Sequence, residues 1–130
     1  MSTITTQAFS TLQAQQYVNL TTFRKNGTPM ATPVWFAQVE DRLYIMTVAD
    51  SGKIKRIRNN GRVLIAPATS SGKQLGPEVE ALARVLPAAE VQVARNALDD
   101  KYGLFKAVFD FFMTVRGVER AWVEVRPVGE

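Results

Sequence analysis

Alternating apolar and polar positions dominate the first part of the chain and predict β-strands there. Residues 17–24 alternate and are rich in β-branched and aromatic side chains, which favour strands. Asn26-Gly27 follows, a strong signal for a β-hairpin, and we expect the return strand over Met30–Val39. A third strand is expected over Leu43–Thr47 after the turn at Glu40-Asp41. These strands would form an antiparallel meander.

Proline residues mark irregular points in this pattern. Pro33 has no backbone N–H to donate, so the second strand should have a bulge there or lie at a sheet edge. Pro67 is expected to end a fourth strand over Val63–Ala66. The Ser- and Gly-rich segment Thr69–Pro77 is then expected to be a mobile loop.

The periodicity becomes helical in two regions. Ile54 and Ile57 are three residues apart, and Asp50 or Ser51 could cap a short helix that ends near residues 59–61. A longer helix is expected over Ala88–Tyr102, with Pro87 at its start and Gly103 at its end. The stretch Leu104–Val115 is apolar on nearly every side, which predicts a helix buried in the core or against a partner. The remaining strands are expected over Glu78–Leu86 and Arg120–Val128.

Six antiparallel strands with helices at the side predict a mainly β fold, a closed or partly closed six-stranded barrel. The chain of 130 residues suits a single domain over residues 1–130. Residues 1–14 are expected to form a loose or helical N-terminal segment.

Two residue types that carry much enzyme chemistry are absent. The chain has no cysteine and no histidine, which excludes disulfides, thiolate nucleophiles, Ser-His-Asp catalysis and His-ligated zinc or haem. We therefore expect no metal site, and any redox chemistry would come from a bound organic cofactor. The net charge of +4 favours anionic ligands without identifying them.

The charge pattern and hydropathy also bear on partners. Lys53, Lys55, Arg56, Arg58 and Arg62 form a basic run, but no aromatic residue lies between them, which argues against single-stranded nucleic acid. No run of about 18 apolar residues could span a membrane, and the polar N-terminal stretch does not resemble a secretory signal. A cytoplasmic location is the expectation.

Two segments are candidates for binding a coenzyme. Thr47, Ser51, Gly52 and Lys53 lie where a strand gives way to a helix, and a helix N-terminus with a hydroxyl and an amine suits a phosphate. An ordinary capped helix with a solvated basic face remains the alternative. On the second strand, Thr32–Phe36 could present backbone groups and Trp35 to a planar heterocycle, or Val34 and Phe36 could simply pack in the core.

Three segments carry a resemblance to a known family. The motifs Leu20–Gly27, Thr32–Phe36 and Ser51–Val63 resemble the pyridoxamine-phosphate-oxidase-like flavin and deazaflavin oxidoreductases. Gly76-Pro77 and Lys101–Leu104 are similar to a short branch classed as dependent on the deazaflavin coenzyme F420. The resemblance spans roughly residues 17–128 and implies a split β-barrel of the FMN-binding type that forms a homodimer, with the coenzyme in a cleft between subunits.

That resemblance implies a set of coenzyme-binding positions. Ser51 and Lys53, with Thr47 nearby, would contact the coenzyme phosphate, and Arg58 could meet a longer anionic tail. The full set is Thr32, Pro33, Val34, Trp35, Met46, Thr47, Ser51, Gly52, Lys53 and Arg58. The coenzyme would be F420 or FMN, and a wide basic groove suits F420 because it carries a phosphodiester and glutamates.

The resemblance implies an oxidoreductase that transfers hydride to a small organic acceptor, with no catalytic side chain assigned. The C-terminal stretch lacks the Arg/His pair with which pyridoxamine phosphate oxidases hold their substrate, which argues against vitamin B6 oxidation. A non-catalytic carrier or sensor of the same coenzyme is the alternative.

Overall fold

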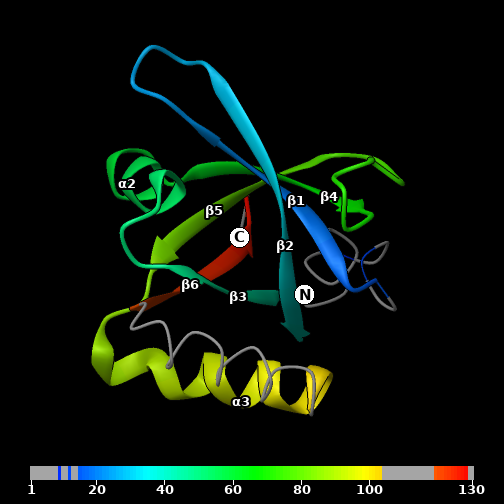
Figure 1. The fold of residues 1–130 in the computed structure, drawn as a ribbon, viewed down its shortest axis with the longest axis vertical. Helices are drawn as coiled ribbons and strands as arrows, with labels where there is room; N and C mark the ends of the chain where they lie inside the picture. Colours follow the sequence, from blue (N-terminus) through cyan, green and yellow to red (C-terminus); the bar gives the residue numbers. More distant parts are fainter. Residues whose placement is uncertain (1–8, 10–11, 13–14, 104–118, 129–130) are drawn as a thin grey trace.

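Six antiparallel strands close into a barrel in the computed structural model, which describes residues 9, 12, 15–103 and 119–128 (Figure 1). The strand order around the barrel is β1-β2-β3-β6-β5-β4. The strands are β1 (Tyr17–Phe23), β2 (Pro29–Val39), β3 (Arg42–Val48), β4 (Arg62–Ala68), β5 (Val79–Val85) and β6 (Arg120–Pro127). The predicted six-stranded antiparallel split barrel is confirmed.

In the described ranges, two helices and a short 3₁₀ turn lie between the strands. Helix α2 (Gly52–Asn59) joins β3 to β4, and η2 (Ala88–Glu90) leads into α3 (Val91–Tyr102). Figure 1 shows α3 lying outside the barrel, across one side of it. The expectation of a helix over Leu104–Val115 concerns residues outside the described part of the chain, as does most of the expected N-terminal segment, residues 1–14.

The barrel interior is filled by apolar side chains that alternate along the strands. Leu20, Ile45 and Val123 have no exposed surface, and each comes from a different strand. Ile54 and Ile57 of α2 pack into the same core. Phe9 and Leu12, the described part of the N-terminal segment, are also buried in it. The alternation that predicted the strands therefore reflects one face buried inside the barrel.

A second apolar cluster lies between α3 and the outer face of the barrel. Ala94, Leu98 and Tyr102 of α3, at helical spacing, pack against Met46 of β3 and Trp122 of β6. The helix ends at Gly103, whose φ of 51° lies in the left-handed region, as the sequence predicted. Within the described ranges, no helix is long and apolar enough to cross a membrane.

Strands β2 and β3 are paired over only part of their length. Their ladder runs from Val39↔Arg42 to Phe36↔Ile45, whereas β2 continues to pair with β1 from Tyr17↔Trp35 to Phe23↔Pro29. Strand β3 pairs with β6 from Leu43↔Val125 to Val48↔Arg120, so beyond Ile45 it keeps only this partner. The two strands therefore separate, and the barrel is split at this point.

The position of Pro33 follows from this separation. Pro33 pairs with Asn19 in an uninterrupted register, so the strand has no bulge there. It lies in the part of β2 that has no ladder with β3, so the alternative expectation, an edge, is correct.

Pro67 does not end β4, contrary to the sequence-based expectation. The strand continues to Ala68, and Pro67 pairs with Val18 of β1. The Pro67 carbonyl accepts a hydrogen bond from the Leu75 N–H at 2.7 Å. Because the N–H and C=O of a strand residue point to the same side, the missing donor would have pointed toward Leu75, and the ladder with β1 loses nothing.

Candidate functional site

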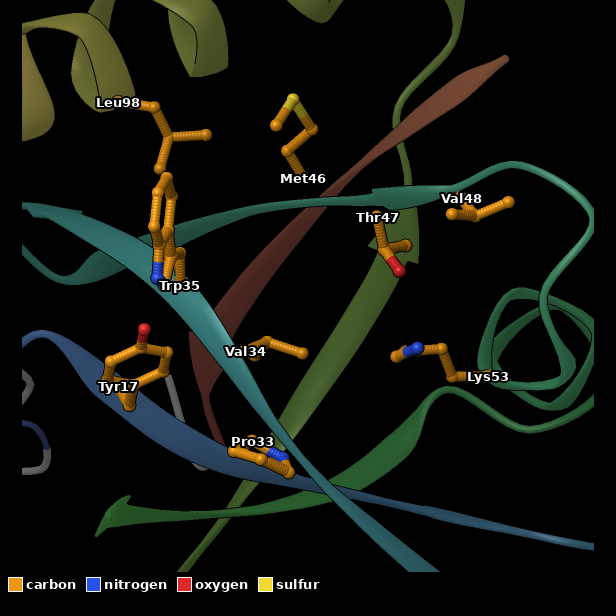
Figure 2. Close-up of a pocket in the computed structure, with 9 residues that line it drawn as sticks. All are labelled: Tyr17, Pro33, Val34, Trp35, Met46, Thr47, Val48, Lys53 and Leu98. Carbon is orange, nitrogen blue, oxygen red and sulfur yellow. The ribbon is translucent and has the colours of Figure 1, made fainter. Parts of the chain in front are cut away.

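A pocket of about 270 Å³ lies where β2 and β3 separate (Figure 2). We call it the ring slot. It is lined by Tyr17, Pro33, Val34, Trp35, Met46, Thr47, Val48, Lys53 and Leu98. Figure 2 shows β2 and β3 on opposite sides of this space, with Lys53 reaching in from the start of α2. Most of the lining is apolar, with one cationic group at the α2 end.

Trp35 is held in a defined orientation at one wall of the slot. Its ring stacks on Tyr102, with centroids 4.9 Å apart and planes 15° from parallel. Tyr17 meets the Trp35 ring edge-on, with centroids 6.4 Å apart. Aromatic contacts of these two geometries are favourable. The indole is therefore fixed by β1 and α3 before any ligand arrives.

Tyr102 is in turn fixed by its hydroxyl, which lies where the β1–β2 ladder ends. The Phe36 N–H donates to the Tyr102 hydroxyl at 3.0 Å. The carbonyl oxygens of Phe36 and Gln16 lie 2.6 and 2.7 Å from that hydroxyl, and either can accept its proton. Burial raises the pKa of the Tyr102 phenol to about 12, so it stays neutral and continues to donate at ordinary pH.

Lys53 brings a positive charge to the slot without a counter-charge. No carboxylate in the described ranges lies within ion-pairing distance of its amine. Burial lowers the pKa of Lys53, and the nearby Arg56 lowers it further. Both effects penalise the charged amine, and an anion placed beside it would relieve that penalty.

Arg56 reinforces the positive charge at the start of α2. Its Nε donates to the Thr22 hydroxyl of β1 at 2.6 Å. A Cβ added to Gly52 would lie 2.7 Å from Arg56 Nη1, so the guanidinium folds back over the first turn of the helix. The first turn of α2 contains no acidic residue. The helix dipole, Arg56 and Lys53 therefore all favour an anion here.

Two buried hydroxyls have no hydrogen-bond partner among the described residues. They are Ser51 Oγ, at the start of α2, and Thr32 Oγ1, on β2. Ser51 occupies the N-cap position, but its side chain makes no capping bond, so that part of the helix prediction is wrong. A buried hydroxyl without a partner costs roughly 1–3 kcal/mol. Such hydroxyls fit a site that a phosphate-bearing coenzyme would complete.

The structure brings six of the ten predicted coenzyme-binding residues together in the slot: Pro33, Val34, Trp35, Met46, Thr47 and Lys53. Thr32, Ser51 and Gly52 are adjacent to these in sequence but do not line it. Arg58 is elsewhere and lines a second cavity.

Sequence reasoning missed Tyr17, Val48, Leu98 and the supporting Tyr102. Leu98 and Tyr102 are four residues apart on one face of α3, and that spacing was a signal of a shared packing surface.

The loop over residues 69–77 adjoins the slot on the outer side of β1 and β2. Asn19 Nδ2 donates to the Gly72 carbonyl at 2.8 Å, and the Thr69 N–H donates to the Lys73 carbonyl at 3.0 Å. A Cβ on Gly72 would lie 3.7 Å from Pro33 Cδ. The loop is therefore held against the strand edge that lines the slot.

Comparison with known proteins supports this architecture. The family model described as pyridoxamine 5'-phosphate oxidase matches residues 4–117. No curated protein matches the chain.

Solved structures share the fold at low sequence identity. An F420 reductase is 23% identical with a TM-score of 0.61, over 93% of each chain. HutZ, the heme storage protein from Vibrio cholerae, is 12% identical with a TM-score of 0.69, over 95% of this chain and 89% of its own. General Stress Protein 26 from Bacillus anthracis is 21% identical with a TM-score of 0.60, over 94% of this chain and 88% of its own.

Proposed function

The chain belongs to the pyridoxamine 5'-phosphate oxidase family, and from that premise we propose that it binds a phosphate-bearing flavin-type coenzyme, F420 or FMN, as an oxidoreductase. The observation that carries the proposal is the Lys53 amine, unpaired with any described carboxylate, at the end of an apolar slot walled by Trp35. An anionic group joined to a planar apolar ring complements that arrangement.

The residues around the start of α2 would hold the phosphate. Lys53 supplies a charge-assisted hydrogen bond, and the Ser51 hydroxyl, which has no described partner, supplies another. The N–H groups of the first turn, beginning at Gly52, add the positive end of the helix dipole.

The strands would hold the ring. Trp35 and Val34 on one side and Met46 on the other provide apolar surfaces, as Figure 2 shows. When bound, the coenzyme supplies the hydride chemistry that no side chain of this protein offers. The protein's own residues bind, orient and exclude water. Among the described lining residues only Tyr17 and Lys53 are ionisable, and none of these residues is a carboxylate or an imidazole.

We favour F420 over FMN as the coenzyme. Both coenzymes offer a phosphate and a tricyclic ring to the same residues. The similarity to an F420 reductase, at 23% identity over 93% of each chain, favours F420. The acceptor would be a small unsaturated organic molecule.

We further propose that the working protein is a cytoplasmic homodimer whose second copy completes the coenzyme cleft. The slot of about 270 Å³ is smaller than the roughly 300–1,000 Å³ typical of small-molecule sites. It accommodates part of a coenzyme, and a second protein surface would enclose the rest.

A coenzyme carrier without turnover is the second candidate. It is favoured by the absence of an acid–base pair among the described lining residues. The similarity to a heme storage protein shows that this fold also serves storage, but this chain has no histidine to ligate haem.

Turnover with a model acceptor tests the proposed function. Reduced F420 or FMN would be mixed anaerobically with menadione, a small quinone, with and without the protein, and coenzyme oxidation followed by absorbance. We expect the protein to accelerate the reaction, and Lys53→Ala to lower the rate at subsaturating coenzyme. Tight binding without acceleration would instead support the carrier.

A further inference from the structure

A second cavity, of about 480 Å³, lies beside β6, the strand that pairs with β3. We call it the arginine cavity. It is bounded by the end of α2, the start of α3 and the first residues of β6. It shares no described lining residue with the ring slot. It is therefore a separate space that the proposed coenzyme site does not use.

Three arginines from three different elements line this cavity. They are Arg58 of α2, Arg95 of α3 and Arg120 of β6. No aspartate or glutamate is present among its described lining residues. Within the described ranges, neither Arg58 nor Arg95 has a carboxylate within ion-pairing distance. The described lining therefore brings positive charge from separate elements to one cavity and contributes no carboxylate to it.

Trp122 connects two of these arginines. The guanidinium carbons of Arg95 and Arg120 lie 5.1 and 5.9 Å from the centre of the indole ring. For Arg95, cation–π contact of this kind holds the guanidinium in place while leaving its N–H groups available to a ligand. Gln92, one turn before Arg95 on α3, adds a neutral amide to the lining.

Convergent arginines of this kind complement an anion with more than one charged oxygen group. A planar guanidinium donates two parallel hydrogen bonds to a carboxylate or phosphate, and three guanidinia from separate elements suit several such groups. A cavity of this volume is within the range of small-molecule sites.

We propose that the arginine cavity binds a small organic polyanion, a molecule with two or more carboxylate or phosphate groups. The proposal stands on this cavity alone and does not depend on coenzyme binding at the ring slot. The two sites are nevertheless neighbours, because Arg120 Nη1 lies 4.0 Å from the sulfur of Met46, which lines the slot.

The two tryptophans of the chain allow ligand binding at the two sites to be measured separately by fluorescence. Trp35 lines the ring slot and Trp122 the arginine cavity, and the chain has no other tryptophan. In a Trp35→Phe protein, fluorescence therefore reports on the cavity. Citrate, a tricarboxylate, and pyrophosphate would be titrated at low salt, with chloride at matched ionic strength as the blank. We expect a saturable change in Trp122 fluorescence with one or both probes.

Charge-removing variants in the same background test which residues bind. We expect Arg95→Gln and Arg58→Gln each to weaken binding by roughly tenfold or more, the scale of a charge-assisted hydrogen bond. Arg126→Gln removes an exposed charge from β6 away from the cavity and serves as the matched control, with no change expected beyond a small general electrostatic effect.

Each outcome decides the matter. Loss with Arg95→Gln and Arg58→Gln, but not with Arg126→Gln or Lys53→Ala, supports the proposal even if no coenzyme binds. Loss with Lys53→Ala alone would mean that the probes occupy the start of α2, and the proposal would be wrong. No saturable signal with either probe, or equal losses in all variants, would also overturn it.

Discussion

Tyr102 is the residue on which the wall of the ring slot depends. Its hydroxyl accepts from the Phe36 N–H and reaches the Phe36 and Gln16 carbonyls, while its ring supports Trp35 from α3. One side chain thus closes the end of the β1–β2 ladder and orients an indole. At the other end of the slot, Lys53 provides the amine that we propose binds the anionic group of the coenzyme.

Removing the Tyr102 hydroxyl should destabilise the fold. Tyr102→Phe leaves the Phe36 N–H buried without its acceptor, which should lower the free energy of unfolding by roughly 1–3 kcal/mol. Urea unfolding measures it, with Tyr17→Phe as the control because no hydrogen bond of the Tyr17 hydroxyl is seen among the described residues. Equal stability of the Tyr102 variant and the wild type would contradict this reading of the contact.

The raised pKa of Tyr102 also predicts a pH dependence. The folded phenol keeps its proton up to about pH 12, whereas an unfolded tyrosine loses it near 10. Between these values the folded state binds more protons, so the stability that this group contributes is present below pH 10 and is lost as pH rises toward 12. The difference in unfolding free energy between wild type and Tyr102→Phe should therefore shrink over that window. A constant difference would show that the phenol's pKa is not raised.

Lys53 predicts a pH dependence of ligand binding. Its pKa is lowered by burial and by Arg56, so the amine loses its charge below its ordinary value of 10.5. Coenzyme affinity should fall as pH rises through the lowered pKa, because only the protonated amine attracts the phosphate. Lys53→Arg, which stays charged, should bind equally from neutral to alkaline pH. The dissociation constant measured against pH would separate the two proteins, and a parallel decline in both would count against Lys53 as the phosphate ligand.

At the scale of elements, the junction between α2 and β4 is held close to β5. The Ala83 N–H of β5 donates to the Gly61 carbonyl at 2.7 Å. A Cβ on Gly61 would lie 2.8 Å from the Ala83 carbonyl oxygen, which is backbone and cannot rotate away. The close approach of this turn to β5 requires glycine.

Gly61→Ala should therefore destabilise the protein by roughly 1–3 kcal/mol, the usual cost of overpacking. Asn59→Ala, at an exposed position at the end of the same helix, is the matched control and should change stability little. Thermal unfolding of the two variants checks the difference. If Gly61→Ala unfolded at the wild-type temperature, the turn would have to be able to move away from β5.

The elements were largely predictable because a barrel buries one face of each strand. Alternation along β1 and β5 reports that burial directly, and Asn26-Gly27 supplies the positive φ of 89° at Gly27 for the hairpin. Pro67 was wrongly predicted to end β4, because the sequence does not show toward which neighbouring strand or loop the absent N–H of a proline would point. The site was predictable where its residues lie in short segments of the chain, as in Pro33–Trp35 and in the stretch from Met46 to Lys53.

Contacts between segments that are distant in the sequence could not be predicted from local sequence patterns. Tyr17 reaches the slot because β1 pairs with β2, and Leu98 because α3 packs on the outer face. Likewise, Arg58 seemed part of the basic run near Lys53, yet its position on α2 turns it toward Arg95 and Arg120. Such contacts depend on the three-dimensional packing of distant segments.

At the scale of the whole molecule, the split between β2 and β3 leaves an incomplete cleft that a second copy would close. The paired part of the barrel is filled by its own core, while the slot opens beyond Phe36↔Ile45. We expect sedimentation equilibrium at micromolar concentration to give twice the mass of one chain. A monomer that still binds coenzyme tightly would show that one copy is sufficient.

The most direct test of the central claim is a fluorescence titration of the purified apoprotein with FMN and F420. The account predicts saturable binding of at least one coenzyme, seen as quenching of Trp35 in a Trp122→Phe background. Lys53→Ala should weaken that binding by about 1.5–3 kcal/mol, roughly 10- to 150-fold, while Lys55→Ala, which removes an exposed charge from the same helix, should not. Absence of binding by either coenzyme, or equal binding by Lys53→Ala and wild type, would contradict the account.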